Sequence, residues 1–508
     1  MPHDLVIGID SSTTATKAIA WDRGGRPVAE GRASVAMSVP QAGWFEQDAD
    51  EWWNAAVQAL KELAGKIDMG SVAAIAISNQ RETFAQFDKE GRALGPGTTW
   101  LDSRATAEVA ELSKSIGGDR IHQISGKPPD VVPCLYRCRW FQKHRPEMWA
   151  AMRMTAEVHG VLTYRLTGDW VTSLASADPM GMIDLAKGDW SDELLGAVGL
   201  DRARVPRLTR PGEVMGTVNI AAAKATGLSA GTQVVAGGGD GQCAGTGADF
   251  FVPGRAYINM GTAVVSGSFG PGYRHHRSFR TATAMADSGF VYESAIRAGT
   301  LLVNWMATQL FGLDSAQAAA MFAQLETQAA KLPIGSEGLV TVPYWSGSMT
   351  PYWDSEARGV IAGFASSHTR GHVYRSMLEG IALEQAMLTA DIERATQPID
   401  HYVAIGGGAA SDLWCQILSD CSGRAVKRSD TVEASSLGAA IAAAKGAGWF
   451  GTIAKASAAM AGKITKTFTP EPKAHARYTE LLAIYRDLWP AVAGWNARIA
   501  NFAKAQHD

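Results

Sequence analysis

The sequence has few cysteines, and they are widely spaced. Only five occur among 508 residues, and none forms a CxxC pair. Zinc sites and disulfide frameworks need closely spaced or evenly paired cysteines, so neither is predicted. We expect five buried thiols in a reducing cytosol. They are Cys134, Cys138, Cys243, Cys415 and Cys421.

Long hydrophobic runs are also absent. No stretch of about 18 consecutive apolar residues occurs, as a membrane-spanning helix would need. The N-terminus enters a predicted strand by Leu5, without the basic and apolar segments of a secretory signal. We therefore expect a soluble, cytoplasmic protein without a membrane partner.

An excess of charge of either sign is missing too. The formal net charge is −3, and 19% of the residues are charged. A nucleic acid or an anionic membrane would need a strongly basic surface, so we predict a small-molecule partner and no nucleic acid. At 508 residues the chain exceeds one domain of about 100–200 residues, so two or more domains are expected.

Glycine, in contrast, is plentiful around one acidic residue. Residues 237–247 follow an apolar run and surround Asp240 with glycines. Glycine lets the backbone turn sharply and approach a ligand, so Asp240 would be presented at the end of a buried strand. A tight strand-to-helix turn with a solvated carboxylate explains this segment, taken alone, equally well.

A strand, a bend and a second strand are predicted twice. Residues 5–21 form the first such unit around a hydroxyl-rich bend, and residues 254–267 repeat the design about half a chain later. Backbone N–H groups and hydroxyls in such bends can hold phosphate oxygens, although bends rich in serine and threonine are also ordinary turns. The repeat favours two structurally similar halves with a boundary near Asp249.

Two further strands end in polar or glycine-rich segments. Residues 72–77 form a predicted strand that is followed by Arg81 and Glu82. Ligands bind beyond the carboxyl ends of strands in open α/β sheets, although a surface ion pair is the alternative. Residues 402–405 form a strand that runs into glycines and a helix beginning near Asp412. Such a helix start favours the negative charge of a nucleotide.

Taken together, these segments resemble the FGGY family of carbohydrate kinases over nearly the whole length, in the family's order. The resemblance implies an α/β fold of two ribonuclease-H-like domains of the actin/hexokinase type, with a central cleft between residues 1–248 and residues 249–508. It implies transfer of the γ-phosphate of ATP to a hydroxyl of a sugar or polyol, with Mg²⁺ as a cofactor. A homodimer is one of the oligomeric states that the sequence allows.

The resemblance also assigns roles to individual residues. The catalytic base is Asp240, and the metal-binding carboxylate is Asp10. Substrate contacts are expected from Arg81, Glu82, Trp100, Asp240 and Gln242. Nucleotide-binding positions are Ser12, Thr13, Thr14, Lys17, Gly261, Thr262, Gly299, Gly407, Gly408, Ala409 and Asp412. One departure from the family pattern is Ser12, which stands where the first phosphate loop usually has a glycine.

The substrate motifs point to different branches of the family. Residues 79–83 and 351–354 resemble glycerol kinases, whereas residues 43–48 and the glycines before Asp240 resemble xylulokinases and related pentulose kinases. Val132 occupies the place of a substrate-binding tyrosine of glycerol kinases. We expect a small ketose or polyol, with a pentulose such as xylulose or ribulose first and glycerol or a tetritol as alternatives.

Two functions of another class remain open at this point. The same fold could serve as a non-catalytic sensor of sugar and nucleotide, or as an actin-like ATPase without a sugar acceptor. The presence of Asp240, Lys17 and Thr262 weighs against a sensor, and Arg81, Glu82 and Trp100 have no role in a simple ATPase.

Overall fold

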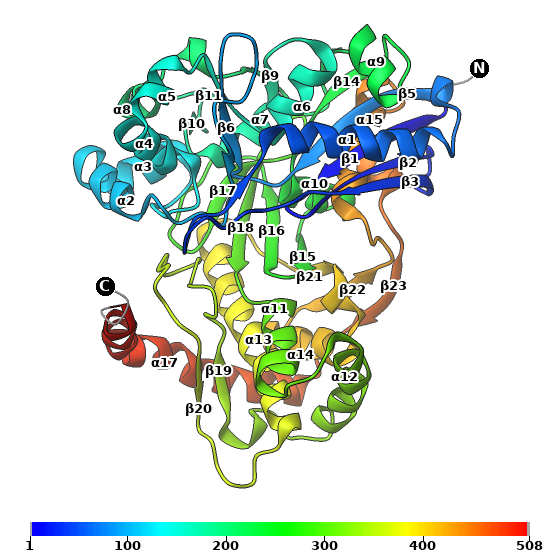
Figure 1. The fold of residues 1–508 in the computed structure, drawn as a ribbon. Coiled ribbons are helices and arrows are strands. Elements are labelled where there is room, and N and C mark those ends of the chain that lie inside the picture. Colours follow the sequence, from blue (N-terminus) through cyan, green and yellow to red (C-terminus); the bar gives the residue numbers. More distant parts are fainter. Residues whose placement is uncertain (1–2, 505–508) are drawn as a thin grey trace.

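The computed structural model describes residues 3–504 as two α/β domains, one above the other in Figure 1. The N-terminal domain is built on a six-stranded sheet in the order β13-β14-β5-β1-β2-β3. Its strands are β1 (Leu5–Ser11), β2 (Ala15–Trp21), β3 (Pro27–Ser34), β5 (Val72–Asn79), β13 (Val214–Thr217) and β14 (Gln233–Gly239).

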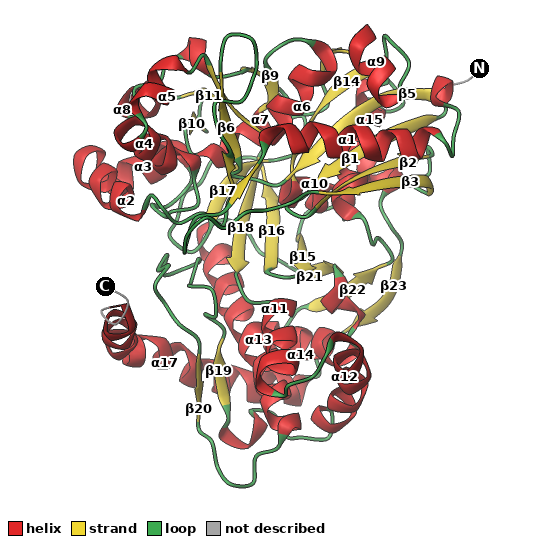
Figure 2. Ribbon diagram, viewed as in Figure 1, coloured by secondary structure: helices red, strands yellow, loops and turns green. Residues whose placement is uncertain are grey.

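The C-terminal domain repeats this plan with a seven-stranded sheet in the order β17-β18-β16-β15-β21-β22-β23. Figure 2 shows helices packed around both sheets. The strands are β15 (Arg255–Met260), β16 (Val264–Gly270), β17 (Arg280–Thr283), β18 (Phe290–Ile296), β21 (His401–Ile405), β22 (Ala425–Ser429) and β23 (Ile464–Phe468). The predicted fold class, two ribonuclease-H-like α/β domains, is confirmed.

The register of the strands brings the predicted site segments to one edge of each sheet. β1 is antiparallel to β2 and parallel to β5, and β5 is parallel to β14. Asn79 therefore lies beside both Ser11 and Gly239, at the carboxyl ends of three strands. In the second sheet β15 and β21 run parallel in the same way. Both predicted strand–bend–strand units are present as antiparallel pairs.

The principal helices follow from apolar periodicity. α1 buries Trp52 and Leu60 against the first sheet and is capped by the Asp48 side chain, which accepts a bond from the Asp50 N–H. α13 is buried along most of its 26 residues. The bounds are α1 (Ala49–Ala64), α10 (Asp240–Gly247), α13 (Arg370–Ala395), α14 (Asp412–Ser422), α15 (Ala434–Gly446), α16 (Ile453–Met460) and α17 (Pro472–Lys504).

One helix of the C-terminal half packs on the N-terminal sheet. α15 lies against β1, β5 and α10. Its small side chains permit close approach, and a Cβ on Gly438 would clash with the backbone of Cys243. α15 therefore packs a segment from the C-terminal half of the sequence against the strands that carry the predicted site.

Both domains also contain shorter helices and strands. The N-terminal domain carries β4 (Glu46–Gln47), β6 (Phe84–Phe87), β7 (Gly97–Thr98), β8 (Met154–Glu157), β9 (Val171–Ser173), β10 (Ile183–Asp184), β11 (Asp189–Trp190), β12 (Arg207–Thr209), α2 (Thr106–Leu112), α3 (Gly118–Ser125), α4 (Cys134–His144), α5 (Pro146–Ala151), α6 (Val158–Thr167), α7 (Leu174–Ala177), α8 (Asp192–Ala197) and α9 (Ile220–Thr226). The C-terminal domain adds α11 (Thr300–Trp305), α12 (Ser315–Ala329), β19 (Val340–Val342) and β20 (Val360–Ala362).

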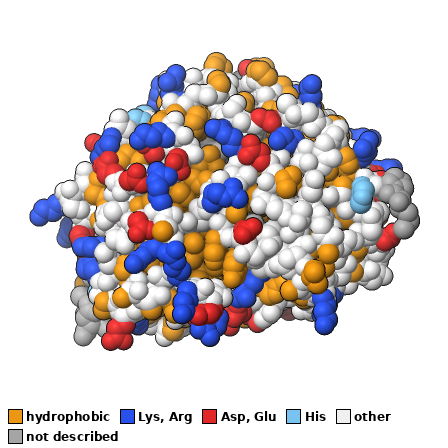
Figure 3. Space-filling model, turned by 90° about the horizontal axis from the view of Figure 1, so that it is seen from above, with side chains coloured by type: hydrophobic (Ala, Val, Ile, Leu, Met, Phe, Trp, Pro, Cys, Tyr) orange, Lys and Arg blue, Asp and Glu red, His pale blue; other side chains and the backbone are white. Residues whose placement is uncertain are grey.

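Cysteine burial and surface charge agree with the sequence-based expectations. All five cysteines are buried and free. On the face seen in Figure 3, basic and acidic side chains are interspersed. Across residues 3–504, none of the helices combines the length and apolar character needed to cross a membrane.

Candidate active site

Asp240 stands at the end of β14 as the first residue of α10. Its side chain is 43% exposed, unlike the buried acids around it. One carboxylate oxygen accepts the backbone N–H of Gly241 at 2.7 Å. The prediction that glycines would present this carboxylate at a strand end is confirmed in its geometry.

Arg81 links Asp240 to the other domain. Its Nε lies 3.0 Å from Asp240 Oδ1, and its Nη1 lies 2.9 Å from Glu293 Oε2 on β18. Glu82 pairs with Arg280 on β17 at 2.8 Å, and Arg280 Nε lies 2.6 Å from Glu293 Oε1. Arg81 and Glu82 therefore form buried ion pairs between the domains instead of the surface pair considered from the sequence.

The two arginines control the charge of these carboxylates. Burial alone would raise the pKa of Glu293, but the guanidinium groups of Arg280 and Arg81 lower it to about 2. Burial raises the pKa of Glu82, against the opposing effect of the same two arginines. Glu293 is thus a fixed anion that holds both guanidinium groups in place.

Gln242 is fully buried beneath this cluster. Its Nε2 donates to the carbonyl of Ala175 at 2.8 Å, and its Oε1 lies 3.4 Å from Arg81 Nη1. The side chain supports Arg81 in this arrangement of the domains.

Asp10 lies at the end of β1 near Asp240 and Glu433. Burial, together with the like charges of Asp240 and Glu433, raises the pKa of Asp10 to about 7 despite a hydrogen bond from the Ser78 hydroxyl at 2.9 Å. This concentration of negative charge is the kind of environment that a cation would relieve.

The bend between β1 and β2 carries the phosphate-binding candidates and contacts Trp100, one of the predicted substrate-binding residues. Trp100 donates its indole N–H to Thr13 Oγ1 at 3.0 Å. Ser12 Oγ donates to the carbonyl of Ala15 at 2.8 Å and so closes the turn, whereas Thr14 is exposed. Lys17 lies on β2, where its Nζ pairs with Glu433 at 2.5 Å.

The bend between β15 and β16 is stabilised by backbone hydrogen bonds from Gly299 and Thr300. The N–H of Gly299 donates to the carbonyl of Thr262 at 2.8 Å, and the N–H of Thr300 donates to the carbonyl of Gly261 at 2.8 Å. A Cβ on Gly299 would clash with Gly261. Gly299 thus fixes the shape of the bend that carries Gly261 and Thr262.

The strand β21 leads into the third glycine segment. Gly407 has open space where a Cβ would point, whereas a Cβ on Gly408 would meet Trp414 and Met260. Ala409 is buried, and Asp412 is paired with Arg428 at 2.7 Å and with Lys466 at 2.5 Å. Gly407 is therefore the position most open to a ligand in this segment.

A small cavity lies between the domains beside the arginine cluster. Its interior space is only about 10 Å³, far below the 300–1,000 Å³ usual for ligand pockets, so this cavity does not hold a substrate in the arrangement that the structure shows. Val132 contributes an apolar wall, and Arg280 faces it from the other domain. The remaining lining residues are Lys127, Pro128, Asp130, Pro133, Met349 and Trp353.

Comparisons with known proteins identify this arrangement. The models of the N-terminal and C-terminal domains of the FGGY family of carbohydrate kinases match residues 5–247 and residues 245–447. The chain belongs to the FGGY family of carbohydrate kinases. It is therefore a sugar kinase, with ATP as the phosphate donor of the family.

FGGY relatives of two kinds are similar to this chain. The xylulose kinase of Bacillus subtilis (strain 168) is 26% identical over 98% of this chain and 99% of that protein. The glycerol kinase of Aromatoleum aromaticum is 31% identical over 88% of this chain and 91% of that protein. The crystal structure of xylulose kinase from Rhodospirillum rubrum is 26% identical, covers 97% of this chain and 100% of that chain, and superposes with a TM-score of 0.90.

Sequence reasoning missed the partners that the C-terminal domain of this FGGY kinase supplies. Arg280 and Glu293 contact Arg81 and Glu82, yet neither belongs to a recognised motif. A signal was available, because both charges occur within strands that are otherwise uncharged and buried. Charged residues are almost never fully buried unless they are paired.

Proposed function

We propose that this kinase phosphorylates a hydroxyl of a small ketose or polyol, with a pentulose such as xylulose or ribulose as the leading substrate. The observation that carries the proposal is the half-exposed Asp240 at a strand end, held by Arg81 and close to the partly buried Asp10. Glycerol and a tetritol are the alternatives. A cytosolic location is proposed because all five cysteines are free thiols.

Asp240 is the proposed general base. Phosphoryl transfer passes through a loose transition state, so the protein mainly orients the nucleophile and screens charge. A carboxylate near the acceptor hydroxyl can align it and take its proton late in the transfer. The contact with Arg81 fixes one oxygen of Asp240 and leaves its exposed side for the hydroxyl.

The surroundings of Asp10 fit a divalent cation. Mg²⁺ prefers oxygen ligands and keeps several waters, so it needs only one or two carboxylates beside the phosphates of ATP. Asp10 supplies such a carboxylate, partly buried and close to the negative charges of Asp240 and Glu433. When bound, the ion would neutralise charge on the phosphate oxygens.

The remaining nucleotide contacts are proposed along three segments. The backbone and hydroxyls of Ser12, Thr13 and Thr14 would bond phosphate oxygens, with Lys17 nearby. The bend at Gly261 and Thr262, braced by Gly299, would act in the same way. On the adenosine side we propose Gly407, Gly408, Ala409 and Asp412, where the open side of Gly407 supports a close approach of the nucleotide.

The substrate preference rests on the wall that Val132 forms. Trp100 offers an apolar face, while Arg81, Glu82 and Gln242 would bond hydroxyls once the domains part. Glycerol has few hydroxyls through which the site could orient it. Val132 also stands where glycerol kinases have a substrate-binding tyrosine, so that polar contact is missing here. A pentulose has further hydroxyls for the polar groups of the cleft. A site built to bond a hydroxyl discriminates far more strongly than an apolar wall does.

The decisive experiment is a coupled assay of ADP release over pentuloses, hexuloses, tetritols and glycerol. We expect kcat/KM for the best four- or five-carbon acceptor to exceed that for glycerol at least about tenfold. Glycerol as the best substrate would contradict the proposed preference. ATP turnover that does not depend on any acceptor would favour the actin-like ATPase, and binding of sugar and ATP without turnover would favour the sensor.

A further inference from the structure

The strand that leads to Asp240 is irregular shortly before its end. Two residues of β14, Ala236 and Gly237, lie opposite the single residue Ile77 of β5, because the pairing of the two strands shifts by one position there. Such an extra residue is a β-bulge, which changes the direction of the side chains that follow and often occurs beside active sites. A Cβ on Gly237 would lie 1.9 Å from the carbonyl oxygen of Ile77, so the bulge requires glycine.

The bulge decides where Asp240 stands relative to β5. In the observed register Gly239 lies beside Asn79. Without the bulge Gly238 would take that place, and Asp240 would lie one residue, about 3.3 Å, further along the strand direction. A shift of one residue also turns a side chain to the opposite face of the sheet. A general base must lie within about 2.6–3.2 Å of the proton that it accepts, so the register of β14 determines which hydroxyl Asp240 can reach.

Two side chains bind the backbone of Gly237 at the bulge. The N–H of Gly237 donates to His159 Nε2 at 3.2 Å, and the hydroxyl of Ser173 donates to the carbonyl of Gly237 at 2.5 Å. Both side chains are fully buried. The extra residue of a bulge is left unpaired by the neighbouring strand, and a buried peptide group needs a partner. His159 and Ser173 therefore stabilise the bulge.

The protonation state of His159 follows from this contact. A ring nitrogen that accepts an N–H must have a lone pair, so Nε2 is unprotonated and Nδ1 carries the hydrogen. Nδ1 lies 3.3 Å from the hydroxyl oxygen of Thr172, which can accept because its own hydrogen is donated to Glu157. Burial lowers the pKa of His159 to about 3, so the ring is neutral near pH 7. His159 is thus a constant hydrogen-bond acceptor.

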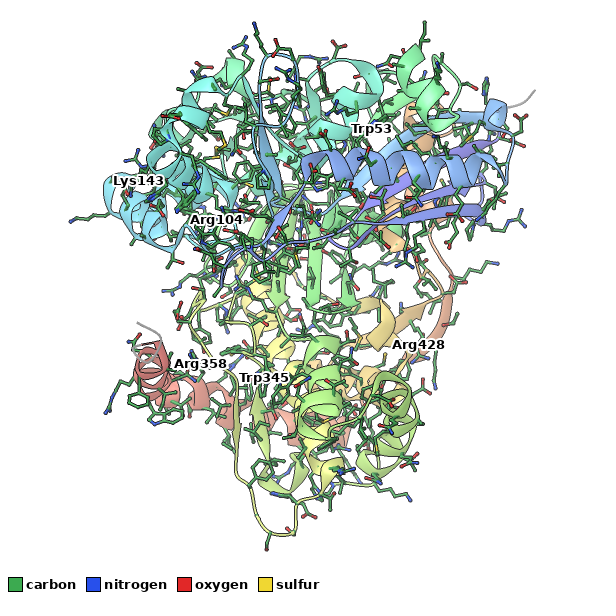
Figure 4. All side chains as sticks on the ribbon, in the orientation of Figure 1. Trp53, Arg104, Lys143, Trp345, Arg358 and Arg428 are labelled. Atoms are coloured by element: carbon green, nitrogen blue, oxygen red, sulfur yellow. The ribbon has the colours of Figure 1, made fainter. Side chains whose placement is uncertain are left out.

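The elements that carry the two side chains pack on β14. His159 is the second residue of α6, and Ser173 ends β9 and caps α7. These three elements all contact β14, and their labels lie together in Figure 1. α6 also packs against α1, on which Figure 4 labels Trp53. His159 and Ser173 are therefore held by fixed parts of the domain.

The same segment also contacts the chain that follows Asp240. Ala175 on α7 donates its N–H to the Ser173 hydroxyl at 3.3 Å and accepts the side-chain amide of Gln242 at 2.8 Å. Residues 173–175 thus bind Gly237, three positions before Asp240, and Gln242, two positions after it. The turn that presents the carboxylate is held from both sides.

We propose that His159 and Ser173 are positioning residues of this kinase, which hold the bulge at Gly237 and thereby set the place of Asp240. The inference rests on the proposed role of Asp240 as the general base. Both residues act through the backbone of Gly237 and not on a substrate. A misplacement of about 1 Å can lower turnover about 10²-fold, so the loss of either contact should be visible in kcat.

Steady-state kinetics of the full chain tests the two contacts. His159→Leu removes the acceptor and should lower kcat at least about tenfold, with the KM for ATP within about threefold of the wild type. His159→Gln should keep kcat within about threefold, because its amide oxygen can accept the Gly237 N–H. Ser173→Ala should also lower kcat. Combined with His159→Leu, it should lower kcat by less than the product of the two separate losses, since both contacts hold one residue.

A double-variant cycle separates this inference from the proposed base. Asp240→Asn alone tests the base. If His159 acts through Asp240, adding His159→Leu to Asp240→Asn should lower kcat by no more than about twofold further. A further loss of about tenfold or more would overturn the positioning role and leave the base in place. Wild-type turnover in Asp240→Asn would refute the base, and hydrogen exchange would then decide whether His159 holds the bulge.

Hydrogen exchange of residues 233–242 without substrates provides that measurement. This segment should exchange at least about tenfold faster in His159→Leu than in the wild type, and at the wild-type rate in His159→Gln. The matched control is Thr226→Val on α9, which removes a buried hydroxyl that donates to the carbonyl of Ala222 at 2.7 Å. It should change neither kcat nor exchange in the segment. Unchanged exchange in His159→Leu, no recovery in His159→Gln, or an equal loss in the control would each overturn the proposal.

Discussion

Asp240 differs from the acidic residues around it in its exposure to solvent. Glu82 and Glu293 are buried and paired with arginines, whereas Asp240 keeps an open side. The glycines before Asp240 predicted this exposure, because they allow a sharp turn at the strand end. The ion pair between Arg81 and Glu293 could not be predicted, since it depends on a contact between residues that lie 212 positions apart.

The first prediction concerns Asp240 as the base. Asp240→Asn keeps an oxygen that can accept from Arg81, so the local structure should persist. Loss of a general base should lower kcat about 10²-fold or more, with binding of ATP and sugar within about tenfold of the wild type. Steady-state kinetics and calorimetry measure both quantities, with the surface variant Asp192→Asn as control. Turnover within threefold of the wild type would remove Asp240 from this role.

A second prediction at this scale concerns a buried carboxylate far from the proposed base. Glu384 on α13 accepts bonds from the hydroxyls of Tyr344 and Tyr485 at 2.8 and 2.7 Å. Burial, with a smaller effect of the negative Asp391, raises its pKa from 4.5 to about 7. The folded state therefore favours the protonated form, so this residue lowers stability progressively as the pH rises from 4.5 to 7.

Glu384→Gln should remove this dependence of the unfolding free energy on pH. The variant should match the wild type near pH 4.5 and exceed its unfolding free energy by up to ~3 kcal/mol at pH 8, from a shift of about 2.5 pH units. Denaturant unfolding at the two pH values provides the measurement. The exposed Glu480→Gln serves as the control and should show no such change. The same difference in unfolding free energy between variant and wild type at both pH values would contradict a raised pKa of Glu384.

At the scale of elements, the sequence predicts segments whose pattern is local. The strand pairs β1–β2 and β15–β16 and the start of α14 occur where the sequence predicted them. The placement of α15 was not predictable in this way. Its alanine-rich sequence fits any close helix contact, and only the tertiary fold sets it on the N-terminal sheet.

The glycine segment after β21 gives the third prediction. Gly407→Val puts a branched side chain into space that is open in this structure and that we assign to adenosine. The KM for ATP should rise at least about tenfold, while the KM for sugar stays within about threefold. Gly451→Val, at another open and exposed glycine, is the matched control. Equal changes in both KM values, or an unstable protein, would assign Gly407 to the fold.

At the scale of the whole molecule, buried charges join the two domains. Lys127 of the N-terminal domain pairs with Asp178 and donates to the carbonyl of Thr281 in the C-terminal domain at 2.7 Å. Asp178 also accepts the backbone N–H of Thr283. Together with the pairs of Arg81 and Arg280, these contacts hold the two domains together beside the small cavity between them.

The last prediction follows from the burial of that pair. Lys127 is 3% exposed and Asp178 is fully buried, so Lys127→Met would leave the Asp178 carboxylate without its cation. Breaking a buried pair in this way costs about 3–5 kcal/mol, because one charge stays uncompensated. The unpaired Asp178 carboxylate is hydrated only when the two domains move apart around it, so the domains of the variant should also separate more easily. We therefore expect a lower unfolding free energy in urea and a larger radius of gyration in the absence of substrates. Lys89→Met, which removes an exposed lysine paired with the exposed Glu90, should change neither quantity measurably. If Lys127→Met proves as stable and as compact as this control, the buried pair does not hold the domains together, and closure must depend on the arginine cluster alone.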